Sequence, residues 1–441
     1  GGLTVQWYET LAIIGGAILL LLGAGMPVAF ALMAVTLGGI LLTQGWGGPF
    51  KQYVLSIKES LGSFTLLPVP LFVLMGEILW HSKIAETALA ALDKLLGRLP
   101  GRLSLLTVVS GTLFSSLSGS TMANTALLGR MLVPEMTRRG YGGVMSMGPI
   151  MASGALAMLV PPSALAVIFA AVAKVSIGQL LLALVVPGIL LATLYAVFIV
   201  VTAARRPDLA PRYEVDTAPL AERLAAVIRH VLPLFAIVFL VIGVIFLGIA
   251  TPTEAAALGC LGSFALAALY GGLTPDNVAK ALRGTAAITV MMLTILAAAI
   301  GFSQLLAYTG ASRGLLDFVV SGLQSPVLFL VLTLALILVL GCFLEQIAIM
   351  LITLPILMPI VLELGIDPIW FSVMVLINLE IALMTPPFGM LLFVMRGVTP
   401  PDISIGDVYR SALPYVAINL VVIGLVLAFP SIALFLPSLA Q

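Results

Sequence analysis

Long runs of apolar residues, separated by short polar segments, fill most of the chain. A helix needs about 20 apolar residues to cross the hydrocarbon core of a bilayer, which is about 30 Å thick. By this measure the runs predict spans over 9–24, 27–44, 63–80, 143–171, 179–203, 230–248, 252–271, 285–307, 369–395 and 411–431. Amphipathic segments over 49–61, 83–98 and 275–284 are predicted to lie at the membrane interface instead.

Other apolar runs are interrupted in their middle. The run over 103–138 is cut by the hydroxyl and glycine cluster from Ser115 to Thr121, and each half makes only about 22–25 Å of helix. This pattern predicts a re-entrant hairpin that turns back inside the membrane. The segment 326–364, with its turn near 341–345, predicts a second one. Proline pairs at 161–162 and 386–387 interrupt the spans 143–171 and 369–395, because proline removes a backbone donor.

A shift of 225 residues superimposes landmarks of the two halves of the sequence. The pairs are Pro27 with Pro252, Gly76 with Gly301, Pro134 with Pro359, Gly140 with Gly365, and Pro161-Pro162 with Pro386-Pro387. One offset that fits several landmarks predicts a duplication, with repeats over 1–225 and 226–441 and a polar join over 203–223. Each repeat would contain one re-entrant hairpin and one proline-broken transmembrane helix.

Composition supports a helical membrane protein, and the distribution of charge predicts its orientation in the membrane. With 61% hydrophobic and only 9% charged residues, the chain lacks the charged surface of a soluble protein. If the hairpins do not cross, all of the 20 Lys and Arg residues except Lys51, Lys58, Lys174 and Arg313 fall on one side, which is therefore cytoplasmic. The repeats then have inverted topology, which is typical of secondary transporters. The net charge of +1 gives no indication of nucleic-acid binding.

The first hairpin turn and the first proline break have the chemistry of a cation site. Na⁺ is a hard cation that prefers oxygen ligands, and carbonyls at helix C-termini carry partial negative charge. The candidate ligands are Ser116, Ser118, Gly119, Ser120, Gly154, Leu159 and Val160. The alternative is that these small residues only allow close helix packing. A second Na⁺ site is predicted at Gly341, Glu345, Thr385 and Pro386.

Helix N-termini near the same turns suit a carboxylate substrate, because their amide groups are unpaired and their dipoles positive. The candidate substrate residues are Ser120, Thr121, Asn124, Pro162, Ser163 and Pro387. Three acids are open to two interpretations. Glu254 fits a capping box with Thr251, while Glu345 and Glu380, like Asn378, are either ligands or hydrogen-bonded scaffold.

Competing classes are an enzyme and a channel. The sequence has no HExxH, no GxSxG and no Cys/His cluster, so an enzyme is not predicted and no catalytic residue is assigned. Re-entrant hairpins also build pores, and a channel stays open as an alternative. Inverted repeats with broken helices favour alternating access.

The sequence resembles the large membrane subunit of tripartite ATP-independent periplasmic (TRAP) transporters, within the wider ion-transporter superfamily. The specific pieces are SSLSGSTMANTA, MLVPPSA, GIATPTEAAALG, LEQIAIMLITLPILMPI and LMTPPFGMLLFVMRGV. The resemblance implies Na⁺-coupled uptake of an organic acid across the bacterial inner membrane by an elevator mechanism. It also implies two partners: a periplasmic substrate-binding protein and a small four-helix membrane subunit, expected as a separate chain.

Overall fold

The computed structural model describes residues 6–44, 47–82, 84–96, 99–118, 120–211, 219–322 and 325–440. The side chains of 115–118 are not described. Within these ranges the regular structure is helical and no strand occurs. The predicted all-α class is therefore confirmed.

The chain up to residue 205 forms ten α-helices within the described residues. They are α1 Trp7–Gly23, α2 Val28–Gln44, α3 Gly48–Leu61, α4 Pro68–His81, α5 Ile84–Leu96, α6 Arg102–Ser118, α7 Thr121–Arg138, α8 Gly143–Ala155, α9 Ala164–Ala173 and α10 Ile177–Arg205. Short 3-10 turns precede α4, at Phe64–Leu66, and follow α8, at Leu156–Met158.

The helices after residue 219 complete the chain. They are α11 Leu220–His230, α12 Leu232–Phe246, α13 Pro252–Leu269, α14 Pro275–Tyr308, α15 Ala311–Gly322, α16 Pro326–Gly341, α17 Gln346–Glu363, α18 Pro368–Met384, α19 Met390–Val398, α20 Ile405–Ala428 and α21 Ser431–Leu439. Helix α11 begins within the last residues of the predicted polar join, 203–223, and continues to His230. Helices α15 and α21 were not predicted.

Local capping explains where several helices begin. At α13 the Thr251 hydroxyl accepts from the Glu254 amide, the Glu254 carboxylate accepts from the Thr251 amide at 2.8 Å, and Pro252 occupies the first helical position. The capping interpretation of Glu254 is confirmed. Thr274 caps α14 in a similar way, with its hydroxyl accepting from the Asn277 amide.

Among the described residues, five helices are long and apolar enough to cross a membrane: α10, α13, α14, α17 and α20. The pair α11 and α12, bent by 43°, makes a sixth candidate. One prediction is wrong here, because 275–284 is not a separate interfacial piece. It forms the first turns of the 34-residue helix α14, which is about 51 Å long and contains no proline after its N-terminus.

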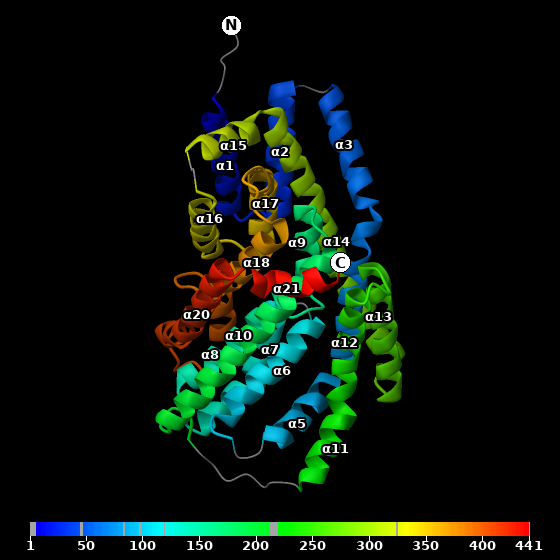
Figure 1. The fold of residues 1–441 in the computed structure, drawn as a ribbon, viewed down its shortest axis with the longest axis vertical. Helices are drawn as coiled ribbons and strands as arrows, with labels where there is room; N and C mark the ends of the chain where they lie inside the picture. Colours follow the sequence, from blue (N-terminus) through cyan, green and yellow to red (C-terminus); the bar gives the residue numbers. More distant parts are fainter. Residues whose placement is uncertain are drawn as a thin grey trace.

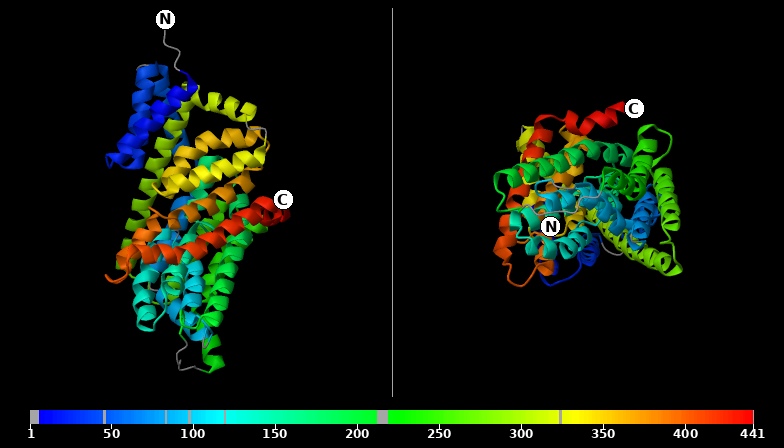
Figure 2. Two further views of the ribbon diagram at one scale, coloured as in Figure 1. Left: turned by 90° about the vertical axis from the view of Figure 1, so that its left-hand side faces the viewer. Right: turned by 90° about the horizontal axis from the view of Figure 1, so that it is seen from below.

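The helices pack into two groups (Figure 1, Figure 2). In the framework group, α4 packs against α13 and α14, and α14 also packs against α2 and α3. In the site group, α8 packs against α6, α7 and α20, while α18 packs against α16, α20 and α10. Helices α9, α17 and α19 belong to the site group through their contacts with α18. The two groups meet where α4 contacts α6 and α9, and where α14 contacts α17.

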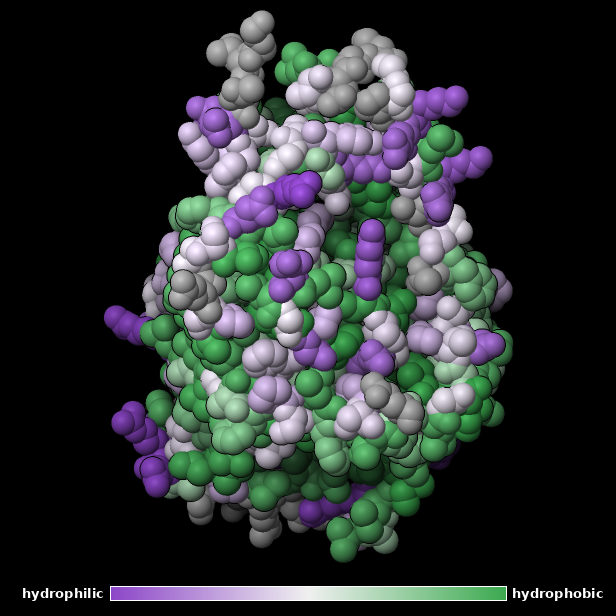
Figure 3. Space-filling model, turned by 45° about the horizontal axis from the view of Figure 1, so that its top comes forward, coloured by the Kyte–Doolittle hydropathy of each residue, from purple (hydrophilic) through white to green (hydrophobic). Residues whose placement is uncertain are grey.

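Large apolar side chains cover much of the outer surface. Leu42, Phe239 and Leu269 are 79–89% exposed, and Figure 3 shows hydrophobic residues spread across one face, with hydrophilic residues gathered mainly toward one end. Such a surface suits lipid, where apolar side chains need no burial. The chain is a multi-pass membrane protein.

Candidate functional site

The first tip is the place where α6 ends, at Ser118, and α7 begins, at Thr121. Ser120 caps α7 by accepting from the Ala123 amide at 3.3 Å. Gly119 and the side chains of Ser116 and Ser118 lie outside the described residues. Of the hydroxyls predicted at this tip, those of Ser120 and Thr121 are therefore placed.

The first break, residues 159–163, lies between α8 and α9. After the turn Leu156–Met158 the chain passes through Pro161 and Pro162, and Ser163 caps α9 by accepting from the Ala166 amide at 3.3 Å. Pro162 and Ser163 are buried. The peptide bond between the two prolines is cis, as it is in the pair 386–387.

Close packing brings the first tip and the end of α8 together. A Cβ added at Gly154 would lie 2.0 Å from Thr125 Oγ1 and 3.1 Å from the Thr121 carbonyl oxygen. Asn124 lies in the same turn of α7 and donates to the Gly111 carbonyl of α6 at 3.2 Å. Small residues therefore do allow close approach here, as the packing alternative proposed, and that approach places hydroxyl oxygens beside the break.

The threonine hydroxyls of the helices are of two kinds: some donate to their own helix, whereas the buried hydroxyl oxygens of Thr36, Thr121, Thr125 and Thr289 have no hydrogen-bond partner among the described residues. Thr107, Thr112 and Thr353 each donate to the carbonyl four residues earlier, at 2.6–2.8 Å. By contrast, Thr121 Oγ1 and Thr125 Oγ1 are buried and have no hydrogen-bond partner among the described residues. A buried oxygen without a partner costs about 1–3 kcal/mol, and native proteins normally satisfy it with another group, water or an ion.

The predicted backbone ligands of the first break differ in their placement. Gly154 lies against the first turn of α7, as described. The Leu159 carbonyl oxygen instead lies against α10, where it would be 2.9 Å from a Cβ added at Gly188. The amides of Leu159 and Val160 both donate to the Leu156 carbonyl. Gly154 is therefore the better placed of the three toward the first tip.

The second tip, residues 341–346, lies beside the second break, residues 385–389. A Cβ added at Gly341 would clash with the Ala382 Cβ at 2.1 Å, and the Cys342 Sγ lies 3.7 Å from the Pro386 carbonyl oxygen. Glu345 is the N-cap residue of α17 without a side-chain capping bond. The structure thus places the second tip next to the C-terminal end of α18 and the second break.

Several oxygens near the second break are already engaged within the protein. The Thr385 hydroxyl donates to the Ile381 carbonyl at 2.7 Å, and the Thr385 carbonyl accepts from the Gly389 amide at 3.1 Å. The Pro387 carbonyl accepts from the Tyr409 hydroxyl at 2.5 Å. These oxygens of the second tip and break are therefore less available to a cation than the Thr121 and Thr125 hydroxyl oxygens of the first tip.

The structure adds two residues that the sequence did not single out, Thr125 and Gln346. Gln346 Oε1 is buried without a hydrogen-bond partner among the described residues, and Gln346 is the first residue of α17 as Thr121 is of α7. The sequence feature that could have identified Thr125 and Gln346 is a polar side chain, a hydroxyl or an amide, inside an apolar run. The amide of Asn378 donates to the Leu334 carbonyl of α16 at 2.7 Å.

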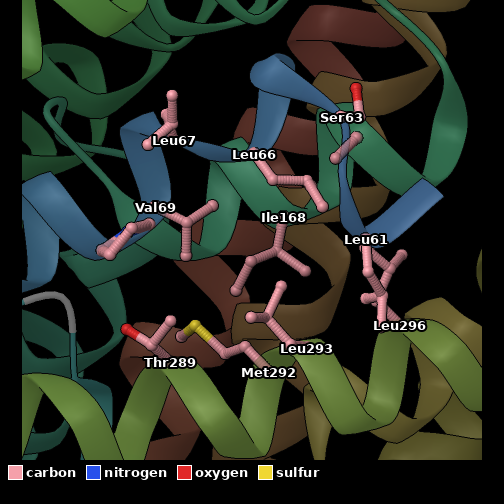
Figure 4. Close-up of a pocket in the computed structure, with 12 residues that line it drawn as sticks. Leu61, Ser63, Leu66, Leu67, Val69, Ile168, Thr289, Met292, Leu293 and Leu296 are labelled. Atoms are coloured by element: carbon pink, nitrogen blue, oxygen red, sulfur yellow. The ribbon is translucent and has the colours of Figure 1, made fainter. Parts of the chain in front are cut away.

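A cavity of about 140 Å³ lies between the two groups, away from both tips (Figure 4). Thr289, Met292 and Leu293 line it from α14, and Ile168 lines it from α9. Its lining is largely apolar, so it does not suit a carboxylate or a cation. None of the predicted site residues lines it.

Paired helices that meet at tips beside proline-interrupted helices define a class, the polytopic membrane transporters with broken helices. The fold is similar to that of the YdaH transporter of Alcanivorax borkumensis, with a TM-score of 0.66 at 16% identity, covering 93% of this chain and 97% of that one. MtrF of Neisseria gonorrhoeae is similar with a TM-score of 0.62 at 14% identity, covering 88% and 85% of the two chains.

Sequence comparison then gives the family. Residues 15–432 match the family described as tripartite ATP-independent periplasmic transporter, DctM component. The C4-dicarboxylate TRAP transporter large permease protein DctM of Rhodobacter capsulatus is 33% identical, covering 97% of this chain and 98% of the relative. The sialic acid TRAP transporter large permease protein SiaM of Vibrio cholerae is 34% identical, covering 95% and 96%. The chain belongs to this family of TRAP transporter large permeases, and it is a permease rather than an enzyme.

Proposed function

We propose that the chain carries out Na⁺-coupled uptake of an organic acid, a carboxylate, across the bacterial inner membrane. A periplasmic substrate-binding protein delivers the acid, and a small four-helix membrane subunit completes the complex. Family membership supports the class of substrate, because the relatives are named for a C4-dicarboxylate and for sialic acid.

The observation that carries the proposal is the set of buried oxygens at the first tip. Thr121 Oγ1 and Thr125 Oγ1 lie where α7 begins and where Gly154 lets α8 approach. Hydroxyl and carbonyl oxygens are suitable ligands for a hard cation such as Na⁺. The fit extends to the C-terminal end of α6, whose terminal carbonyls carry partial negative charge. The capped N-termini of α7 and α9, at Ser120 and Ser163, are the places for a carboxylate.

Two inverted repeats are the second part of the proposal. Adding 225 to the bounds of α7, Thr121–Arg138, gives those of α17, Gln346–Glu363. The same shift relates α1 to α12, α2 to α13, α5 to α15, α6 to α16, α8 to α18, α9 to α19 and α10 to α20, within a few residues. Helix α14 covers the range of both α3 and α4. This correspondence supports a duplication with halves over 1–225 and 226–441.

An elevator motion is the third part. The ion pairs that described residues form with one another lie within single helices or join α5 to α11 and α5 to α6. None of them joins α6–α9 or α16–α19 to the framework group. A body that slides past its framework needs such an interface without interlocking charges, and the packing supports this motion.

The test uses proteoliposomes that contain the complete complex and its binding protein. Replacing external Na⁺ with choline at constant pH should abolish uptake, because the site would lack its coupling cation. Omitting the binding protein should also reduce uptake of free substrate to background. Full uptake driven by a proton gradient alone would refute the Na⁺ coupling.

A further inference from the structure

Glu380 is the most deeply buried acid of the site group. It lies on α18, its side chain is 0% exposed, and none of the ion pairs formed by described residues includes it. An acid inside a membrane protein is costly unless it has partners or a role. We therefore examine which groups the Glu380 side chain contacts.

The Glu380 carboxyl group contacts the other half of the chain. Its Oε1 accepts from the Met158 backbone amide at 3.1 Å. Met158 ends the short turn that connects α8 to the first break, and α18 and α6 both pack against this turn. The contact joins the proline-interrupted helix of the second half to the break of the first half.

This contact has no equivalent in the reverse direction. The residue 225 positions before Glu380 is Ala155, which has no side-chain acceptor. Among the described residues, a side-chain carboxyl group holds the first break in this way and not the second, and the first tip carries Thr121 and Thr125, whose hydroxyl oxygens have no hydrogen-bond partner there. Gly154, which contacts Thr125, lies four residues before Met158.

We propose that Glu380 is a positioning residue for the first cation site. By holding the Met158 amide, its carboxyl oxygen fixes the turn Leu156–Met158 and therefore the place of Gly154 against Thr125. The inference rests on the proposed function, because it assigns the residue to the Na⁺ site proposed above. The required property is an acceptor oxygen at this place. The amide oxygen of glutamine can accept the same bond from the Met158 amide, so Glu380→Gln keeps this acceptor.

The test compares Glu380→Gln, which keeps the acceptor, with Glu380→Leu, which removes it at similar volume. Ser372→Ala is the matched control, because Ser372 is buried on the same helix and its hydroxyl donates to the Pro368 carbonyl within α18. In proteoliposomes of the full complex, Glu380→Leu should raise the Na⁺ concentration for half-maximal uptake about tenfold, with a smaller change in maximal rate. Glu380→Gln and Ser372→Ala should stay within about twofold of the wild-type concentration.

Hydrogen–deuterium exchange of the same proteins gives an independent measurement. The Met158 amide should exchange slowly in the wild type and in Glu380→Gln, and faster in Glu380→Leu. If Glu380→Leu does not assemble, Glu380→Ala takes its place. Wild-type Na⁺ affinity in the Leu or Ala variant would overturn the inference, and so would equal impairment of the Gln variant. Uptake that is independent of Na⁺ in the wild type would refute the proposed function, while the exchange measurement would still test the Met158 contact.

Discussion

At the scale of single residues, the proposed Na⁺ site depends on which buried oxygens lack a hydrogen-bond partner within the protein. Thr353 lies in α17 and donates to its own helix at Ile349, as threonines commonly do in apolar helices. The Thr125 hydroxyl, which is also buried, has no hydrogen-bond partner among the described residues. The sequence predicted a hydroxyl cluster at 115–121, but it did not distinguish Thr125 from an ordinary helical threonine. Gly154, which lies against Thr125, belongs to another helix, so this neighbour could not be read from the local sequence.

Replacement of Thr125 by valine removes the hydroxyl and nearly keeps the shape. We expect Thr125→Val to raise the Na⁺ concentration for half-maximal uptake at least tenfold, because a cation ligand is lost. The loss of one tenfold factor corresponds to about 1.4 kcal/mol of binding free energy. Thr353→Val is the control and should leave this concentration within about twofold. Na⁺ titration of uptake measures both, and wild-type affinity in Thr125→Val would remove this residue from the site.

At the scale of the helices, the interruptions were predictable and some boundaries were not. Serine caps helix N-termini and proline lacks a backbone donor, so serine clusters and proline pairs predict helix ends. The end of α6 at Ser118 and the break before Ala164 could therefore be expected. Charged residues at the start of α14, including Lys280, made that segment resemble an interfacial helix. Since Thr274 caps the helix and no proline follows its first turn, it continues into the membrane. Packing against α4 was not visible in the sequence.

Close approach of α8 to α7 should make Gly154 sensitive to substitution. In Gly154→Ala the added Cβ would meet Thr125 Oγ1 and would force the helices apart. We expect a loss of about 1–3 kcal/mol in stability, by analogy with overpacked cores, together with weakened Na⁺ binding. Gly424→Ala in α20 is the control, because nothing lies within 4 Å of its added Cβ. Thermal unfolding of the purified complex, with and without Na⁺, measures both effects. An unchanged midpoint and an unchanged Na⁺ shift in Gly154→Ala would contradict the packing argument.

At the scale of the whole molecule, the arrangement divides into a framework group and a site group. Both tips, both breaks and Glu380 belong to the site group, so its motion would carry the site as one body. Periodicity and an internal repeat could predict the class of fold, because both are local or arithmetic properties of the sequence. Which helices form each group depends on side-chain packing, such as that of α4 against α13 and α14, and required the structure.

Linking the two groups should stop transport. Val69 of α4 and Ile168 of α9 line the same cavity from opposite groups. After Cys260 and Cys342 are replaced by alanine, a Val69→Cys/Ile168→Cys pair joined by a short bifunctional reagent should lose most uptake. Either single cysteine variant treated with the same reagent should keep it. Undiminished uptake by the linked protein would mean that the two groups do not move past each other.

The most direct test of the central claim counts Na⁺ and substrate entering the same vesicles. Proteoliposomes with the full complex and its binding protein would receive radioactive Na⁺ and labelled organic acid. We predict that Na⁺ enters together with the organic acid in a fixed ratio. Na⁺ entry should be lost when the acid or the binding protein is omitted. Substrate accumulation with no accompanying Na⁺ would contradict the account.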